Sequence, residues 1–135
     1  MSFRTLAVIV ALVTLALGAG YLFAGSLMMA RWQLETSATA ALLCRRIGAV
    51  YLGLSVVFYF ARSVPASDGR TGLCVGGAVM CVLLGVLGLY ELGAGHAGRG
   101  ILMSAALEIL LAAAFVGRLL ADRRARTART SQAGA

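Results

Sequence analysis

The sequence predicts an all-α fold: a membrane-embedded, up-down bundle of four helices. Of the 135 residues, 61% are hydrophobic and only 13% are charged. A typical soluble domain is about half apolar and about a quarter charged. The charged residues lie mainly between four long apolar runs. This pattern is typical of a chain whose helices are surrounded by lipid.

The first helix is expected at residues 5–30, directly after Arg4. An apolar run that follows a basic residue resembles a secretory signal peptide. This run is about 26 residues long, whereas the apolar part of a signal peptide usually has about 7–15. The length therefore predicts an uncleaved transmembrane helix.

The remaining helices are expected at residues 42–61, 73–92 and 100–120. About 20 apolar residues are enough to cross a bilayer core of about 30 Å. The links are short, and one contains the turn formers Pro65-Ala66-Ser67-Asp68-Gly69. Short links make consecutive helices antiparallel neighbours.

These spans place a single transmembrane domain at residues 1–120 and a basic cytoplasmic tail at residues 121–135. The tail is rich in Arg, Thr and Ala, and we expect it to be frayed. Its residues Arg123, Arg124, Arg126 and Arg129 are predicted to contact lipid head groups, because arginines next to a span are attracted to anionic lipid.

The arginines predict the orientation. One side of the bilayer would hold Arg4, Arg62, Arg70, Arg118, Arg123, Arg124, Arg126 and Arg129, and the other Arg31, Arg45, Arg46 and Arg99. Arginines near helix ends mark the cytoplasmic side. We therefore expect both termini in the cytoplasm of a bacterium, with the helices in its inner membrane. Nucleic-acid binding is not predicted, because it needs a basic face on a folded soluble domain.

The third helix carries a stripe of small residues at spacings of three and four. The stripe consists of Cys74, Ala78, Cys81, Gly85 and Gly88, and Gly72 and Gly76 add a GxxxG motif. Helices in lipid associate through close backbone contact, which small residues permit. The helix is therefore expected either at the centre of the bundle or at the interface of a homo-oligomer or larger membrane complex.

A short internal similarity links the first two helices. The segment Gly18-Ala19-Gly20-Tyr21-Leu22 is echoed by Gly48-Ala49-Val50-Tyr51-Leu52. A match this brief is interpreted as chance and not as a repeat.

Glu108 is the most informative polar residue, because it interrupts the fourth apolar run. It would lie about 12 Å deep, where a charge costs roughly 2.5–3.5 kcal/mol, so it is expected to face the bundle interior with Ser104. Arg45 is predicted to point inward and pair with Glu108, while Arg46 extends outward. Glu91, at the end of the third helix, would join them.

Three interpretations of this polar group remain open. The residues form a buried ion pair that locks two helices together, or a site for a proton, an ion or an anionic head group. In the third, Glu108 is protonated and partly exposed to lipid.

No segment matches an enzyme motif, and we predict neither catalytic residues nor a metal site. The three cysteines form no Cys-x-x-Cys pair and no cluster with zinc spacing. His96 lies in a glycine-rich link and is expected to be solvated.

One segment carries a family resemblance. Arg45-Arg46-Ile47-Gly48-Ala49-Val50-Tyr51-Leu52-Gly53-Leu54, together with the run 100–115 and four helices in a short chain, resembles the DoxX-like group of small bacterial four-helix membrane proteins. The resemblance implies the same fold over most of the chain. Some members are associated with quinone-linked sulfur oxidation, so it also implies a quinone as cofactor, although no residue here carries a redox role across.

Three functions are therefore expected in order of preference. The first is a non-enzymatic accessory or structural membrane component that acts through helix contacts. The second is a small transporter or channel that uses Glu108 and Arg45. The third, from the resemblance alone, is a quinone-linked redox subunit.

Overall fold

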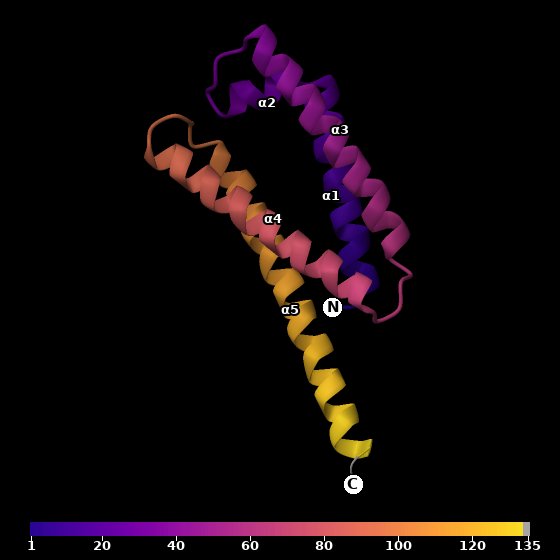
Figure 1. The fold of residues 1–135 in the computed structure, drawn as a ribbon. Coiled ribbons are helices and arrows are strands. Elements are labelled where there is room, and N and C mark those ends of the chain that lie inside the picture. Colours follow the sequence, from indigo (N-terminus) through magenta and orange to yellow (C-terminus); the bar gives the residue numbers. More distant parts are fainter. Residues whose placement is uncertain (134–135) are drawn as a thin grey trace.

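The described part of the chain in the computed structural model is residues 1–133, without the side chains of residues 126 and 129–133. It forms the helices α1 (Phe3–Phe23), α2 (Gly25–Arg31), α3 (Ala38–Ala61), α4 (Asp68–Gly93) and α5 (Ile101–Ala133). Successive long helices run in opposite directions (Figure 1). Four helices are long and apolar enough to cross a membrane, and the described residues contain no strand. The predicted all-α class with four long apolar helices is confirmed.

The first predicted span is divided between two helices. α1 ends at Phe23, and Ala24 leaves the helical conformation with φ −131° and ψ 34°. The short helix α2 then packs against the first turns of α3. A Cβ atom added to Gly25 would lie 3.0 Å from Cys44 Cβ, so the absence of a side chain permits this close contact.

The tail also differs from expectation, because its backbone is helical up to Ala133 and not frayed. Its Ala and Arg residues are strong helix formers, and no Gly or Pro interrupts them before residue 134. The last turns of α5 extend past the other helices (Figure 1).

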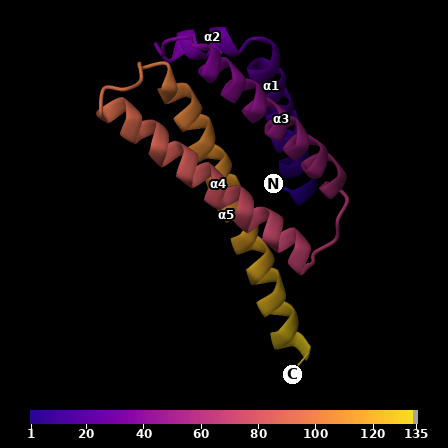
Figure 2. The same ribbon diagram turned by 45° about the horizontal axis from the view of Figure 1, so that its top comes forward.

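The long helices are arranged as two antiparallel pairs, α1 with α3 and α4 with α5 (Figures 1 and 2). We call the end that holds the chain's N terminus the N-terminal end. There the pairs share a core that includes Phe3, Leu6, Phe58, Cys74 and Phe115. The rings of Phe58 on α3 and Phe115 on α5 join the pairs, with centroids 5.8 Å apart.

The opposite end, here called the α2 end, holds α2 and residues 94–100. A smaller cluster of Tyr21, Met29 and Cys44 lies within the first pair there. The pairs are linked by the backbone N–H of Gly98, which donates to Trp32 O at 2.7 Å. The molecule is therefore tightly packed between the pairs at the N-terminal end and less so at the α2 end.

Glycines determine how α1 crosses α3. A Cβ atom on Gly18 would lie 3.0 Å from Gly48 O, and one on Gly48 would lie 2.9 Å from Gly18 O. The two backbones are thus in direct contact. Next to this crossing, the rings of Tyr21 and Tyr51 are stacked, with centroids 5.8 Å apart and an interplanar angle of 4°. The two segments whose similarity was interpreted as chance therefore lie face to face.

Small residues also line the contact between α4 and α5. Cys74, Ala78, Cys81, Gly85 and Gly88 of the predicted stripe are all buried. A Cβ atom on Gly88 would lie 3.5 Å from Ile101 of α5. Gly72 and Gly76 are different, because a Cβ atom on either would meet nothing within 4 Å. The stripe thus belongs to the α4–α5 contact, and the GxxxG motif faces away from it.

Candidate functional site

A cavity of about 430 Å³ lies between the two helix pairs at the α2 end. Its polar and aromatic lining consists of Tyr21, Trp32, Glu91, His96, Ser104 and Glu108, and the other lining side chains are mainly apolar. A smaller cavity of about 50 Å³ lies next to it, toward the N-terminal end, and is also lined by Tyr21, Ser104 and Glu108. Glu108 therefore lies where the two spaces meet.

Glu108 lies on α5 with Ser104 one turn before it, and its side chain is half-buried. Gly85 of α4 lies beside the carboxyl, because a Cβ atom there would be in van der Waals contact with Glu108 Oε2 at 3.7 Å. Among the described residues, Glu108 has no hydrogen-bond or ion-pair partner. The carboxyl group is thus available to a ligand that enters the cavity.

The structure does not bring Arg45 or Arg46 to this site. Both side chains are exposed on α3, and neither takes part in an ion pair within residues 1–133. The reason is the rotation of α3: its buried face contains Cys44 and Gly48, which the glycine crossing directs toward α1. Residue 45 is turned about 100° from residue 44, and so points elsewhere.

Glu91 and His96 lie at the mouth of the cavity. His96 Nδ1 is 2.9 Å from Glu91 Oε2. The His96 side chain is 67% exposed, as expected for this link, but it is bonded to a neighbour. Of the predicted polar group, Glu91, Ser104 and Glu108 therefore line one cavity.

Aromatic rings form the wall of the cavity opposite Glu108's own helix. Tyr21 of α1 contacts Trp32 edge to face, with centroids 6.1 Å apart, and it stacks on Tyr51 of α3. Aromatic faces attract cations and planar rings. Sequence reasoning missed Tyr21 and Trp32, since only the bend at Ala24 brings them together. The shared Gly-x-x-Tyr pattern of the two similar segments was the available signal for the tyrosines.

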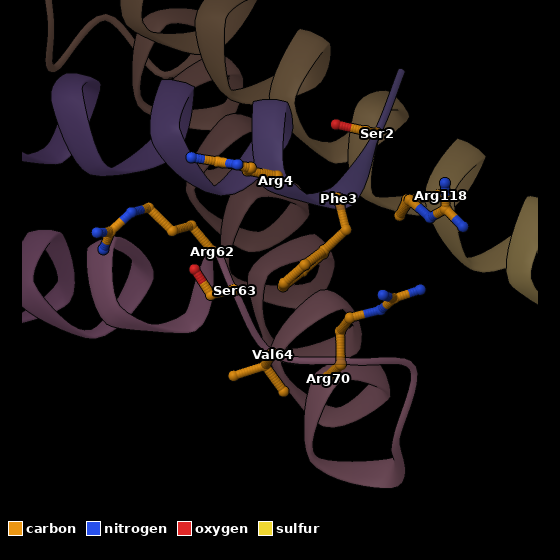
Figure 3. A pocket seen from close by; sticks show the side chains of 8 residues that line it. All are labelled: Ser2, Phe3, Arg4, Arg62, Ser63, Val64, Arg70 and Arg118. Atoms are coloured by element: carbon orange, nitrogen blue, oxygen red, sulfur yellow. The ribbon is translucent and has the colours of Figure 1, made fainter.

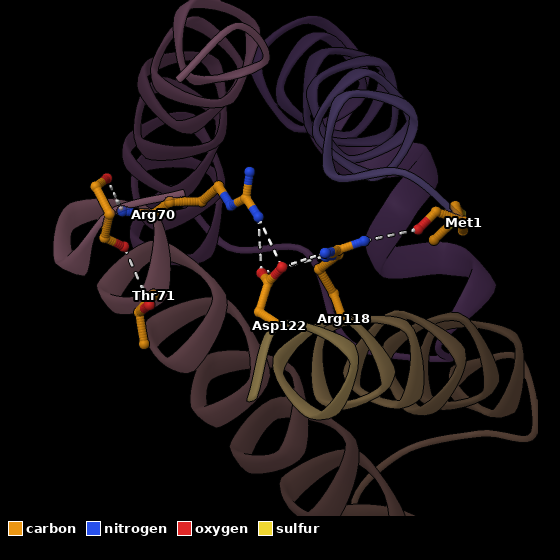
Figure 4. Close-up of polar contacts among 6 residues, drawn as sticks. Met1, Arg70, Thr71, Arg118 and Asp122 are labelled. Carbon is orange, nitrogen blue, oxygen red and sulfur yellow. Dashed lines mark hydrogen bonds and ion pairs between the residues drawn. The ribbon is translucent and has the colours of Figure 1, made fainter. Parts of the chain in front are cut away.

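A second polar cluster, at the N-terminal end, was also missed. Arg70 Nη2 of α4 donates to both carboxylate oxygens of Asp122, at 2.8 and 2.9 Å. Arg118 Nε donates to Asp122 Oδ2 at 3.2 Å, and Arg118 Nη1 donates to Met1 O at 3.4 Å (Figure 4). The i,i+4 spacing of Arg118 and Asp122 was a usable signal. This cluster ties α4 to α5 and to the start of the chain.

The tail arginines are described only in part. Arg123 and Arg124 are exposed on α5. The side chains of Arg126 and Arg129 lie outside the described residues, so their predicted contact with lipid head groups stays a prediction.

These features define a small all-α protein with four helices able to cross a membrane and an open cavity between two helix pairs. No protein-family model matches the chain, and no similar curated protein or solved structure was found. The resemblance to the DoxX-like group therefore stays an expectation from the sequence.

Proposed function

We propose that this protein is a small multi-pass membrane transporter or carrier that binds a cationic small molecule, with Glu108 as its counter-charge. One observation carries the proposal. A half-buried carboxyl group without a hydrogen-bond or ion-pair partner among the described residues lies in the wall of an aromatic-lined cavity. A carboxylate in such a place is costly unless a proton or a cation neutralises it.

The outer surface of the helices supports the membrane location. Each long helix exposes large apolar side chains, such as Leu12 (61%), Val50 (64%), Val86 (62%) and Leu110 (68%). Soluble proteins rarely expose apolar patches of this extent. We place the N-terminal end in the cytoplasm of a bacterial cell and the cavity mouth on the outer side of its inner membrane, on the strength of the arginine distribution.

Proton exchange follows from the chemistry of a single carboxyl. A protonated Glu108 that binds a cation releases its proton, and the carboxylate then neutralises the ligand. Rebinding of a proton removes that charge and weakens the hold on the cation. One site thus couples proton movement to cation movement, as long as only one of the two is bound at a time. Tyr21 and Trp32 would contact the apolar part of the ligand.

Binding of a lipophilic cation to the purified protein tests the proposal. We expect tetraphenylphosphonium, titrated calorimetrically in detergent, to bind wild type at least about tenfold more tightly than Glu108→Gln, because the variant lacks the counter-charge. Acidification should weaken binding to wild type only. Glu35→Gln, which removes one charge from an exposed position outside the cavity, is the matched control and should bind like wild type.

Two results would argue against the proposal. One is equal affinity of wild type and Glu108→Gln for the cation. The other is tight binding of a neutral quinone that does not depend on Glu108, which would favour the redox subunit implied by the family resemblance. Proton-coupled uptake of the cation into liposomes would then separate transport from simple binding.

An accessory role through helix contacts is the second candidate. Gly72 and Gly76 are open and line a surface groove of about 440 Å³ between α3 and α4. Such a surface fits a partner helix. If this role is correct, Gly76→Leu should change the oligomeric state or the co-purifying partner without changing cation binding. Gly53→Leu, at another open glycine, is the control.

A further inference from the structure

A second cavity, of about 500 Å³, lies at the N-terminal end of the molecule. Arginines from four segments line it: Arg4 of α1, Arg62 just after α3, Arg70 of α4 and Arg118 of α5. We infer that this basic pocket binds the phosphate group of an anionic membrane lipid.

The charge balance of the pocket favours an anion. Asp122 neutralises part of the charge of Arg70 and Arg118, and the described residues that line the pocket include no acidic side chain. Within residues 1–133, Arg62 donates to the carbonyl oxygen of Tyr59 and lies over its ring, both neutral groups. Arg4 has no hydrogen-bond or ion-pair partner among the described residues. Two guanidinium groups therefore lack a counter-ion within the described part of the chain, and guanidinium matches phosphate geometry well.

The other side of the pocket is preorganised. The carboxylate of Asp122 holds Arg70 in place, and the guanidinium carbon of Arg70 lies 4.9 Å from the centroid of the Phe3 ring. The Arg70 side chain is only 13% exposed. Arg4 and Arg62 lie on one side of the Phe3 ring, and Arg70 and Arg118 lie on the other (Figure 3). The hydroxyl-bearing Ser2 and Ser63 add neutral donors to the rim.

The position of the pocket favours a lipid as the source of the phosphate. α1 begins at Phe3, α3 ends at Ala61 and α4 begins at Asp68, so three apolar helices start or end at its level. In a bilayer the head groups lie at this level, and basic pockets between helices on the cytoplasmic side bind such groups. The partly exposed Val64 offers apolar contact to the glycerol region. The inference rests on the membrane location proposed above and is independent of Glu108.

Lipid binding to the full chain in detergent micelles tests the inference. Native mass spectrometry and thermal unfolding would be followed during titration with short-chain phosphatidylglycerol, phosphatidylcholine of equal chain length, and inorganic phosphate. We expect wild type to bind the anionic lipid and to unfold at a higher temperature with it. The double variant Arg4→Gln/Arg62→Gln should bind it about tenfold or more weakly, because two charges next to the phosphate are lost.

Arg45→Gln/Arg46→Gln is the matched control, because it removes two exposed arginines from the start of α3. It should bind the anionic lipid within about twofold of wild type. Arg4→Gln alone changes an exposed side chain, so it keeps the test informative should the double variant not fold, and its binding should be weaker than that of wild type. Tetraphenylphosphonium binding at the other cavity should be unchanged in all three variants.

Three outcomes would overturn the inference. Equal losses of lipid binding in the double variant and its control would show attraction to the overall charge. Equal binding of phosphatidylcholine would show that the phosphate charge is not recognised. Binding of inorganic phosphate as tight as that of the lipid would assign the pocket to a free anion.

Discussion

Two carboxyl side chains of α5 lie in opposite surroundings. Asp122 accepts hydrogen bonds from two guanidinium groups, whereas Glu108 faces a cavity without a partner among the described residues. Removing the charge of Asp122 leaves two arginines without their shared counter-ion. Removing the charge of Glu108 relieves an unpaired group. The same chemical change should therefore have different effects on stability at the two positions.

We expect Asp122→Asn to lower the free energy of unfolding by about 1–3 kcal/mol, since it weakens charged hydrogen bonds. Glu108→Gln should stay within about 1 kcal/mol of wild type or be more stable, because an uncompensated charge is costly. Denaturant-induced unfolding in detergent would measure both.

The effects of Glu108→Gln and Arg45→Gln on stability should simply add, because additivity is the rule for residues without contact. A clear coupling free energy between the two substitutions in the double variant would support the Arg45–Glu108 ion pair expected from the sequence. It would contradict the arrangement described here.

Properties of single residues could be predicted from the sequence when they depend on spacing within one helix. Properties that depend on how two helices are rotated against each other could not. The position of Glu108 within its apolar run, one turn after Ser104, could be predicted from spacing alone. So could the shared face of the stripe of small residues from Cys74 to Gly88 on α4. Whether Arg45 reaches Glu108 depends on the rotation of α3 about its own axis, which the sequence does not give. That rotation is fixed by the contact of Gly18 with Gly48, which a weak hydrophobic periodicity does not reveal.

At the scale of the elements, the crossing of α1 and α3 depends on one backbone contact. A Cβ atom on Gly48 would lie 2.9 Å from both Gly18 O and Leu22 N. Backbone atoms cannot move aside as the end of a flexible side chain can. The two helices would have to separate, and the stacked tyrosines beside the crossing would separate with them.

We therefore expect Gly48→Ala to lower the free energy of unfolding by about 1–3 kcal/mol through overpacking. Gly53 of the same helix has open space at its Cβ position. Gly53→Ala should then be neutral or stabilising by up to about 1 kcal/mol, because alanine is the better helix former. Thermal unfolding of both variants in one detergent would measure the difference, and equal midpoints would contradict the close crossing.

The boundaries of the elements show which information the sequence lacks. The long helices follow from the length of their apolar runs, because in lipid a helix satisfies the hydrogen bonds of its own backbone N–H and C=O groups. The break at Ala24 does not, since alanine favours helix and the run continues to Ala30. The break accompanies the contact of Gly25 with Cys44, a residue of the next long helix.

At the scale of the whole molecule, the orientation in the membrane can be tested directly. Reporter fusions after Ala135 and within residues 63–67 should report the cytoplasm, because the arginine-rich end is expected there. Fusions within residues 34–37 and at Gly95 should report the opposite side. Alkaline phosphatase and fluorescent-protein fusions would measure the two compartments. A cytoplasmic signal at Gly95 would reverse the orientation or change the number of spans.

The unequal packing of the two ends has a mechanical consequence. From the contact of Phe115 with Phe58, which joins the pairs, α5 extends back to Ile101 as an arm of about 21 Å. A rotation of about 7° at that contact would move the far end of the arm by about 3 Å, about the width of a water molecule. The pivot is crowded by aromatic rings, whereas the far end is held by contacts of residues 31–33 with residues 98–103, among them the hydrogen bond from Gly98 N–H to Trp32 O. A tilt of this size between the helix pairs would therefore change their spacing at the α2 end by about the width of a water molecule.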